Sequence, residues 1–133
     1  MWMKSFGIKG ATVCSAVTGE EENKAGFKIV LEDRTLDFFA FGGKDNNWVP
    51  GVLPLDYVGG WVHVMFTIDY ESNKMSFYVY FYKVFEIDAP QFTKTIASVK
   101  DASFIVGQNE TRDCKAGLAA LLDDFIVCDK VKM

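Results

Sequence analysis

The sequence predicts an all-β fold, a two-sheet antiparallel β-sandwich that occupies residues 1–133 as a single domain. Short runs rich in β-branched and aromatic residues recur about ten times along the chain, with polar or glycine-containing turns between them. None of these runs shows the 3.6-residue apolar stripe that is typical of an amphipathic helix. Half of the residues are hydrophobic and 15% are aromatic, so a chain of this length can bury a continuous core.

The first strand candidates are residues 1–6 and 11–17, with Gly7 and Gly10 between them. A charged loop follows at residues 18–24, where three consecutive glutamates indicate a solvated turn rather than a cation site.

Residues 26–31 and 36–41 form the next predicted strand pair, joined by a turn at residues 32–35. In the second of these strands, Asp37, Phe39 and Phe41 alternate with Leu36, Phe38 and Ala40. Both of its faces therefore carry apolar groups, which predicts a central strand with little exposure on either side.

Residues 42–60 form the longest stretch without strand character and hold two of the three prolines and five of the eleven glycines. Because this stretch also contains Trp48 and other apolar residues, we expect an ordered loop. Amide and carboxylate groups stand beside the indole, at Asp45, Asn46 and Asn47. These groups bond sugar hydroxyls and a ring stacks on the apolar face of a pyranose, which predicts a carbohydrate site. The alternative is that Trp48 folds over the sandwich edge and the polar residues only make turns.

A hairpin of residues 61–68 and 75–82, with a polar turn at 69–74, is predicted as the centre of the sandwich. Strand candidates after this hairpin are residues 84–89, 94–99, 102–107 and 118–128.

Three motifs resemble the laminin G-like, concanavalin A-like jelly-roll superfamily. Residues 60–69 (GWVHVMFTID) with 75–79 (MSFYV) resemble its central hairpin, 104–107 (FIVG) one later strand, and 121–127 (LLDDFIV) its closing strand. Residues 1–4 (MWMK) are similar to an early strand of the family. The resemblance implies a jelly-roll fold and a secreted or cell-surface location. It also implies a calcium site, with Asp123 and Asp124 at the positions of the metal ligands. The alternative for these two aspartates is hydrogen bonding to loop backbone.

The chain departs from the family pattern in two places. An opening strand that pairs near the closing one has no counterpart, so either the chain is a piece of a larger protein or another strand, such as one from a homodimer partner, fills the gap. The family's tight turn after its "Y-V" strand is replaced by Tyr80, Phe81 and Tyr82. Because aromatic residues fit a positive φ poorly, we expect the turn to have moved or widened. The rings either form a ligand platform or extend into a core or interface, and the second alternative is favoured.

Composition excludes several classes of function. The net charge of −4 argues against nucleic-acid binding. The sequence contains no run of about 18 apolar residues, so no membrane span is predicted. Residues 1–6 lack the pattern of a signal peptide. The three cysteines, at Cys14, Cys114 and Cys128, are either free thiols or include a Cys114–Cys128 disulfide.

Catalysis has little support in the sequence. The single histidine, His63, has no triad or zinc partners and is expected to be a hydrogen-bonded core residue. Glu86 and Asp88 have suitable spacing for a glycosidase, but Pro90 follows and no third acid does. The predicted function is therefore a non-catalytic carbohydrate-binding module, with Asp45, Asn46, Asn47, Trp48, Tyr80 and Tyr82 as ligand-binding residues. The alternatives are a protein-interaction domain that oligomerises and, last, a glycoside hydrolase fragment.

Overall fold

The computed structural model describes residues 1–6, 10–18, 25–42, 45–54, 57–69, 71–88, 104–107 and 118–127, which contain ten strands and no helix. The strands are β1 (Trp2–Ser5), β2 (Ala11–Thr18), β3 (Ala25–Leu31), β4 (Thr35–Gly42), β5 (Asp45–Val52), β6 (Trp61–Asp69), β7 (Lys74–Val79), β8 (Tyr82–Asp88), β9 (Ile105–Val106) and β10 (Ala120–Asp123). The predicted all-β class is confirmed. The described residues include no helix with the length and hydrophobicity that crossing a membrane requires.

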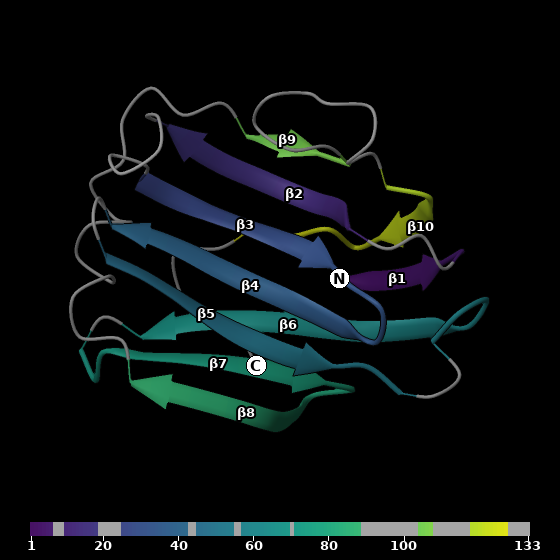
Figure 1. The fold of residues 1–133 in the computed structure, drawn as a ribbon. Helices are drawn as coiled ribbons and strands as arrows, with labels where there is room; N and C mark the ends of the chain where they lie inside the picture. The colour runs from purple at the N-terminus through teal and green to yellow at the C-terminus, as the bar shows by residue number, and fades with distance from the viewer. Residues whose placement is uncertain are drawn as a thin grey trace.

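The strands form two five-stranded sheets that face each other as a β-sandwich (Figure 1). The first sheet has the order β10-β1-β6-β7-β8, and the second has the order β5-β4-β3-β2-β9. Every named strand pair is antiparallel, as predicted.

The core lies between the sheets and is built from the alternate residues of each strand that face inward. Phe38 of the second sheet stacks on Phe66 of the first with ring centroids 5.1 Å apart, and Phe66 contacts Phe77 at 4.7 Å. Phe77 is fully buried. The Phe38–Phe66 stack thus joins the two sheets, while Phe66 and Phe77 pair within the first sheet, and burial of one such side chain contributes about 1.5–3 kcal/mol.

Strand β4 is covered on both faces, as its sequence predicts. Leu36, Phe38 and Ala40 are buried in the core, while Asp37 and Phe41 on the opposite face are also buried. A charged side chain is thus held in a position where it has little access to water.

The prediction of a strand-free loop at residues 42–60 is wrong, because β5 occupies Asp45–Val52 and pairs with β4 along its whole length. Gly51 fits this strand because a Cβ there would lie 2.6 Å from Cζ of Phe77. Pro50 is tolerated because β5 is the last strand of its sheet, where one lost backbone donor costs little.

The turn between β7 and β8 has neither moved nor widened, which contradicts the prediction. Val79 pairs with Tyr82, and only Tyr80 and Phe81 stand between them. Their φ angles of 47° and 70° are the signature of a type I′ turn, whose twist matches that of the flanking strands. The geometry of the hairpin therefore prevails over the preference of two aromatic residues for negative φ.

The remaining predictions are partly resolved. The closing strand β10 is shorter than the expected 118–128 and stops at Asp123, because Asp124 has a φ of 49°. The strand candidate at 94–99 lies outside the described residues, as do Cys114 and Cys128. Cys14 is a buried free thiol, as one alternative predicted, and burial raises its pKa to about 12.

Candidate functional site

A row of polar and aromatic residues crosses the outer face of the first sheet. Across the β10–β1 ladder Asp123 lies opposite Trp2, and across the β1–β6 ladder Trp2 lies opposite His63. The Tyr80 backbone N–H donates to the His63 carbonyl at 3.0 Å, which extends the row to the β7–β8 turn. Opposed residues of an antiparallel pair share a face, so we call Asp123, Trp2, His63, Tyr80 and Phe81 the aromatic row.

Side-chain contacts hold the strained turn in place. Phe81 stacks on the His63 imidazole with centroids 4.2 Å apart and planes 24° apart. The Tyr80 hydroxyl donates to the Trp61 carbonyl at 3.0 Å, and the Tyr80 ring lies 6.2 Å from Trp2. A positive φ costs a residue with a side chain roughly 1–2 kcal/mol, so these contacts offset a real cost.

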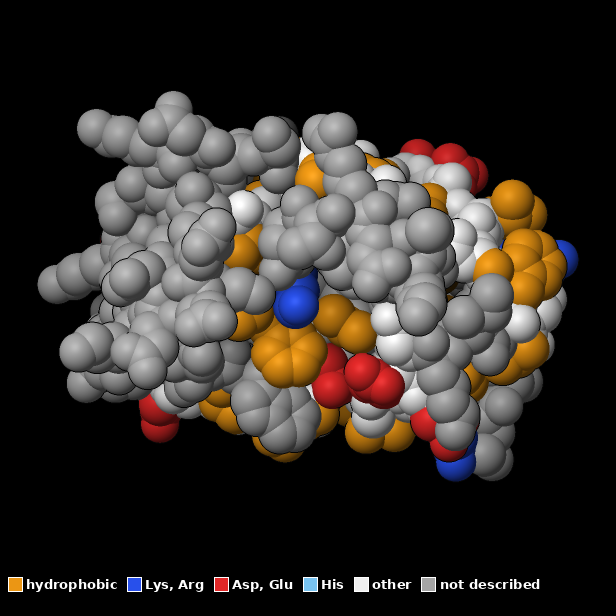
Figure 2. All heavy atoms as spheres, turned by 45° about the horizontal axis from the view of Figure 1, so that its top comes forward, with side chains coloured by type: hydrophobic (Ala, Val, Ile, Leu, Met, Phe, Trp, Pro, Cys, Tyr) orange, Lys and Arg blue, Asp and Glu red, His pale blue; other side chains and the backbone are white. Residues whose placement is uncertain are grey.

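The rings of the turn are exposed, so they do not extend into the core, while their place in an interface stays a prediction. Tyr80 is 40% exposed, Phe81 65% and Tyr82 79%. Trp61 is also exposed, at the start of β6. Figure 1 shows this turn and the start of β6 at the right-hand end of the molecule, and hydrophobic side chains also reach the surface at that end in Figure 2.

His63 is not the hydrogen-bonded core residue that the sequence predicts. It lies on the outer face, half-buried, with Trp2 edge-on at 5.1 Å. Its Nδ1 atom is buried and has no hydrogen-bond partner among the residues that the structure describes. Burial lowers the His63 pKa and the Met1 amine lowers it further, while Asp124 acts in the opposite direction. A neutral imidazole is the form that stacks here near pH 7.

Asp123 and Asp124 stand at the β10 end of the aromatic row, both exposed. Asp123 is the last residue of β10, and Asp124 lies beyond the end of the strand. An Asp123 Oδ1 atom accepts the Asp124 backbone N–H at 2.8 Å, a local bond of the kind that the alternative to a calcium site predicted. Within the described ranges, no three His, Cys, Asp or Glu side chains gather as metal ligands, and calcium binding stays a prediction.

The structure does not bring the two predicted ligand-binding groups together. Asp45, Asn46, Asn47 and Trp48 belong to β5 of the second sheet, whereas Tyr80 and Tyr82 flank the turn of the first sheet. In Figure 1, β5 begins at the left of the molecule, and the β7–β8 turn lies at the right. The side chains of residues 45–48 lie outside what the structure describes, and their role stays a prediction.

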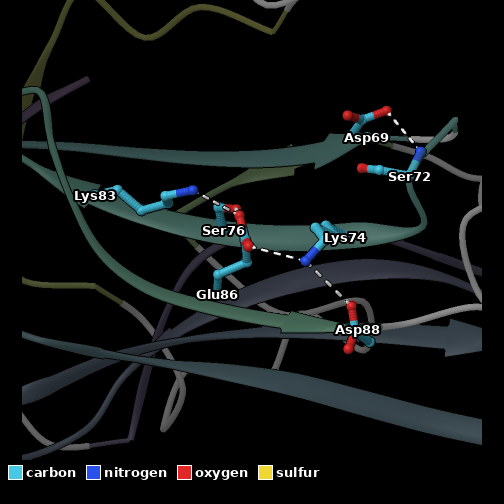
Figure 3. Close-up of polar contacts among 7 residues, drawn as sticks. All are labelled: Asp69, Ser72, Lys74, Ser76, Lys83, Glu86 and Asp88. Carbon is cyan, nitrogen blue, oxygen red and sulfur yellow. Dashed lines mark hydrogen bonds and ion pairs between the residues drawn. The ribbon is translucent and has the colours of Figure 1, made fainter.

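A network of charges occupies the same outer face beyond the turn (Figure 3). Glu86 accepts hydrogen bonds from Lys83 Nζ at 2.8 Å, from Ser76 Oγ at 3.0 Å and from Lys74 Nζ at 3.2 Å. Lys74 Nζ also lies 3.4 Å from Asp88. The bond from Lys83, then those from Lys74 and Ser76, lower the pKa of Glu86 to about 2. A carboxylate held ionised in this way is poorly suited to donate a proton in glycoside hydrolysis.

Sequence reasoning missed Trp2, Trp61 and His63 as neighbours of the predicted tyrosines. Alternation along β6 was the available signal, because it sets Trp61 and His63 on the face opposite the buried Val62 and Val64. The sequence contained no comparable signal that Trp2 and Asp123 would lie on the same row, since that depends on strand order.

Comparison with protein-family models, curated proteins and solved structures found no match for this chain.

Proposed function

We propose that this domain is a non-catalytic carbohydrate-binding module whose ligand lies on the aromatic row and the neighbouring Tyr82. The observation that carries the proposal is the exposure of Phe81 and Tyr80 in a turn that their residue types disfavour. Backbone strain of this kind concentrates at functional sites, because glycine or asparagine would build the same turn without it.

The chemistry of the row suits a sugar. Exposed rings of Phe81 and Tyr82 offer apolar faces on which a pyranose ring can stack. Asp123 and Asp124 supply carboxylate oxygens that accept hydrogen bonds from hydroxyl groups. Several aromatic rings beside a few acidic oxygens are a combination that fits the binding of a sugar.

A glycan array tests the proposal. We expect Phe81→Ala and Tyr82→Ala each to weaken binding of a positive glycan by about tenfold, the effect of losing a stacking contact of about 1.5 kcal/mol. Val52→Ala is the matched control, because Val52 is an exposed apolar residue of the second sheet. Loss of signal with Trp48→Ala but not with Phe81→Ala would move the site to β5.

The second candidate function is protein interaction. The observation that favours it is the exposure of Val84 and Phe85 on β8, beyond the aromatic row. Absence of any glycan signal from a folded wild-type protein would favour this alternative.

A further inference from the structure

Strand β8 is the most open edge that the structure describes. Figure 1 shows it at the lower rim of the first sheet, and no described strand pairs with its outer side. It runs for seven residues without glycine or proline. The other edge strands are less suited to pairing: β9 has two residues, β10 has four, and Pro50 interrupts β5.

The side chains of β8 alternate between apolar and charged groups. Across the β7–β8 ladder, Tyr82, Phe85 and Ile87 lie opposite inward-facing residues of β7. Lys83, Glu86 and Asp88 lie opposite the outward-facing residues, and the register shift leaves Val84 unpaired. Val84 is 48% exposed and Phe85 39%, so apolar surface on both sides of the bulge is in contact with water. An edge strand with this surface favours pairing with another strand.

We propose that β8 pairs antiparallel with β8 of a second copy of this chain, with Phe85 on the two-fold axis. Because the bulged Val84 stays outside the new ladder, as it does in the pairing with β7, this register places Lys83 opposite Glu86 of the second copy on the outer face. It also places Tyr82 opposite Ile87 of the second copy on the inner face. The first sheets of the two copies then form one continuous ten-stranded sheet, since each has five strands.

Charge selects this register over its neighbours. A shift by one same-face pair in one direction sets Glu86 opposite Glu86, and a shift in the other direction sets Lys83 opposite Lys83. Like charges directly opposite each other destabilise a strand pair. The first shift also pairs Lys83 with Asp88, but only the proposed register gives two opposite-charge pairs and no like-charge pair. A lysine and a bulge on an edge strand usually discourage pairing with another chain. In the proposed dimer, however, Glu86 of the second copy lies opposite Lys83 and offsets its charge.

The occupant is a second copy because β8 is complementary to itself. In the proposed register, Lys83 of each copy lies opposite Glu86 of the other copy. An unrelated strand would carry this charge pattern only by chance. The proposal can be tested apart from carbohydrate binding: Tyr82 belongs to both surfaces, but Lys83 and Glu86 can be altered without changing the aromatic row or Tyr82.

Sedimentation velocity over a concentration series tests the proposal. We expect the wild type to pass from the 14.9 kDa monomer to a species of about twice that mass. Lys83→Glu and Glu86→Lys should each raise the dimer dissociation constant about tenfold or more, because symmetry applies each repulsion twice.

Mixing the two variants gives the decisive result. In a heterodimer of Lys83→Glu with Glu86→Lys, both cross-strand pairs are again of opposite charge, so the mixture should dimerise although neither variant does alone. Damage to the fold of one chain would not be repaired by mixing. Phe85→Lys should also abolish the dimer, with Ile126→Lys, an exposed position outside β8, as its control. A wild type that stays monomeric at all concentrations, or a mixture that stays monomeric, would overturn the proposal.

Discussion

Asp37 is the residue whose position conflicts most with its chemistry. It lies on the outer face of β4 between Val30 and Pro50, and its Oδ1 atom is buried without a hydrogen-bond partner in the described part of the chain. Burial raises the pKa of the Asp37 carboxyl, and a hydrogen bond with the Thr35 side chain opposes that shift. The folded state therefore holds the Asp37 proton more tightly than the unfolded state does.

The sign of the pH effect follows from this shift. At pH values below the pKa of Asp37 in the unfolded state, the carboxyl is protonated in both states. It then carries no charge and does not lower the free energy of unfolding. Above the folded pKa, the charged group destabilises the folded state fully, so its contribution lowers the free energy of unfolding as pH rises through that interval.

We therefore predict that Asp37→Asn raises the free energy of unfolding on the order of 1 kcal/mol at pH 7, because the neutral amide keeps the shape of the side chain and removes the charge that burial penalises. The gain should nearly vanish at pH 3. Urea denaturation at both pH values measures it, with the exposed Glu71→Gln as control. A gain of equal size at both pH values would show that the charge of Asp37 is not the cause.

The β7–β8 hairpin shows a local preference that conflicts with the element around it. Six paired residues of β7 are matched by β8, and Val79 opposite Tyr82 leaves two residues for the turn. The strand pairing fixes φ above zero at both turn positions, whichever side chains occupy them. The strain at Tyr80 and Phe81 is thus imposed by the element and only partly offset by contacts with His63 and Trp61.

We predict that the double substitution Tyr80→Asn with Phe81→Gly stabilises the protein by about 1 kcal/mol. Relief of two positive-φ penalties of about 1–2 kcal/mol each exceeds the loss of one ring stack and one hydrogen bond. The same variant should lose glycan binding. Thermal and urea denaturation measure the first effect and the glycan array the second.

Tyr80→Phe serves as the comparison for this prediction. It keeps the backbone strain and removes the hydrogen bond to the Trp61 carbonyl, so it should lower stability by about 1 kcal/mol. If the Asn–Gly variant also proves less stable than the wild type, the ring contacts outweigh the strain.

At the scale of the whole molecule, the two sheets approach each other closely at Gly51. A Cβ at this position would lie 2.6 Å from the ring of Phe77 in the first sheet and 2.7 Å from the carbonyl oxygen of Leu36. One of these neighbours is backbone and the other is a fully buried ring, so neither can give way without moving the sheets.

We predict that Gly51→Ala lowers the free energy of unfolding by about 1–3 kcal/mol, the usual cost of overpacking a core. Val52→Ala, at the exposed neighbouring position, should change it by less than about 0.5 kcal/mol. Denaturant titration compares the two variants. A neutral Gly51→Ala would mean that the sheets separate easily at this edge.

The sequence by itself determined the all-β class, the two-sheet architecture and most of the strands from β2 to β7. These follow from alternation and turn residues, which act over a few neighbouring positions. The sequence also identified residues 80–82 as unusual for a turn. It did not predict that Tyr80 and Phe81 would form a tight turn with positive φ angles.

Only the tertiary structure decided which residues share a surface. Strand order brought Asp123, Trp2 and His63 onto one row although they are distant in the chain, and it separated Trp48 from Tyr80 by placing them in different sheets. It also made a strand of Asp45–Val52, because pairing with β4 outweighed the turn preference of its asparagines, proline and glycine. Contacts between strands depend on pairing across the whole sheet, and no local pattern in the chain specifies that pairing.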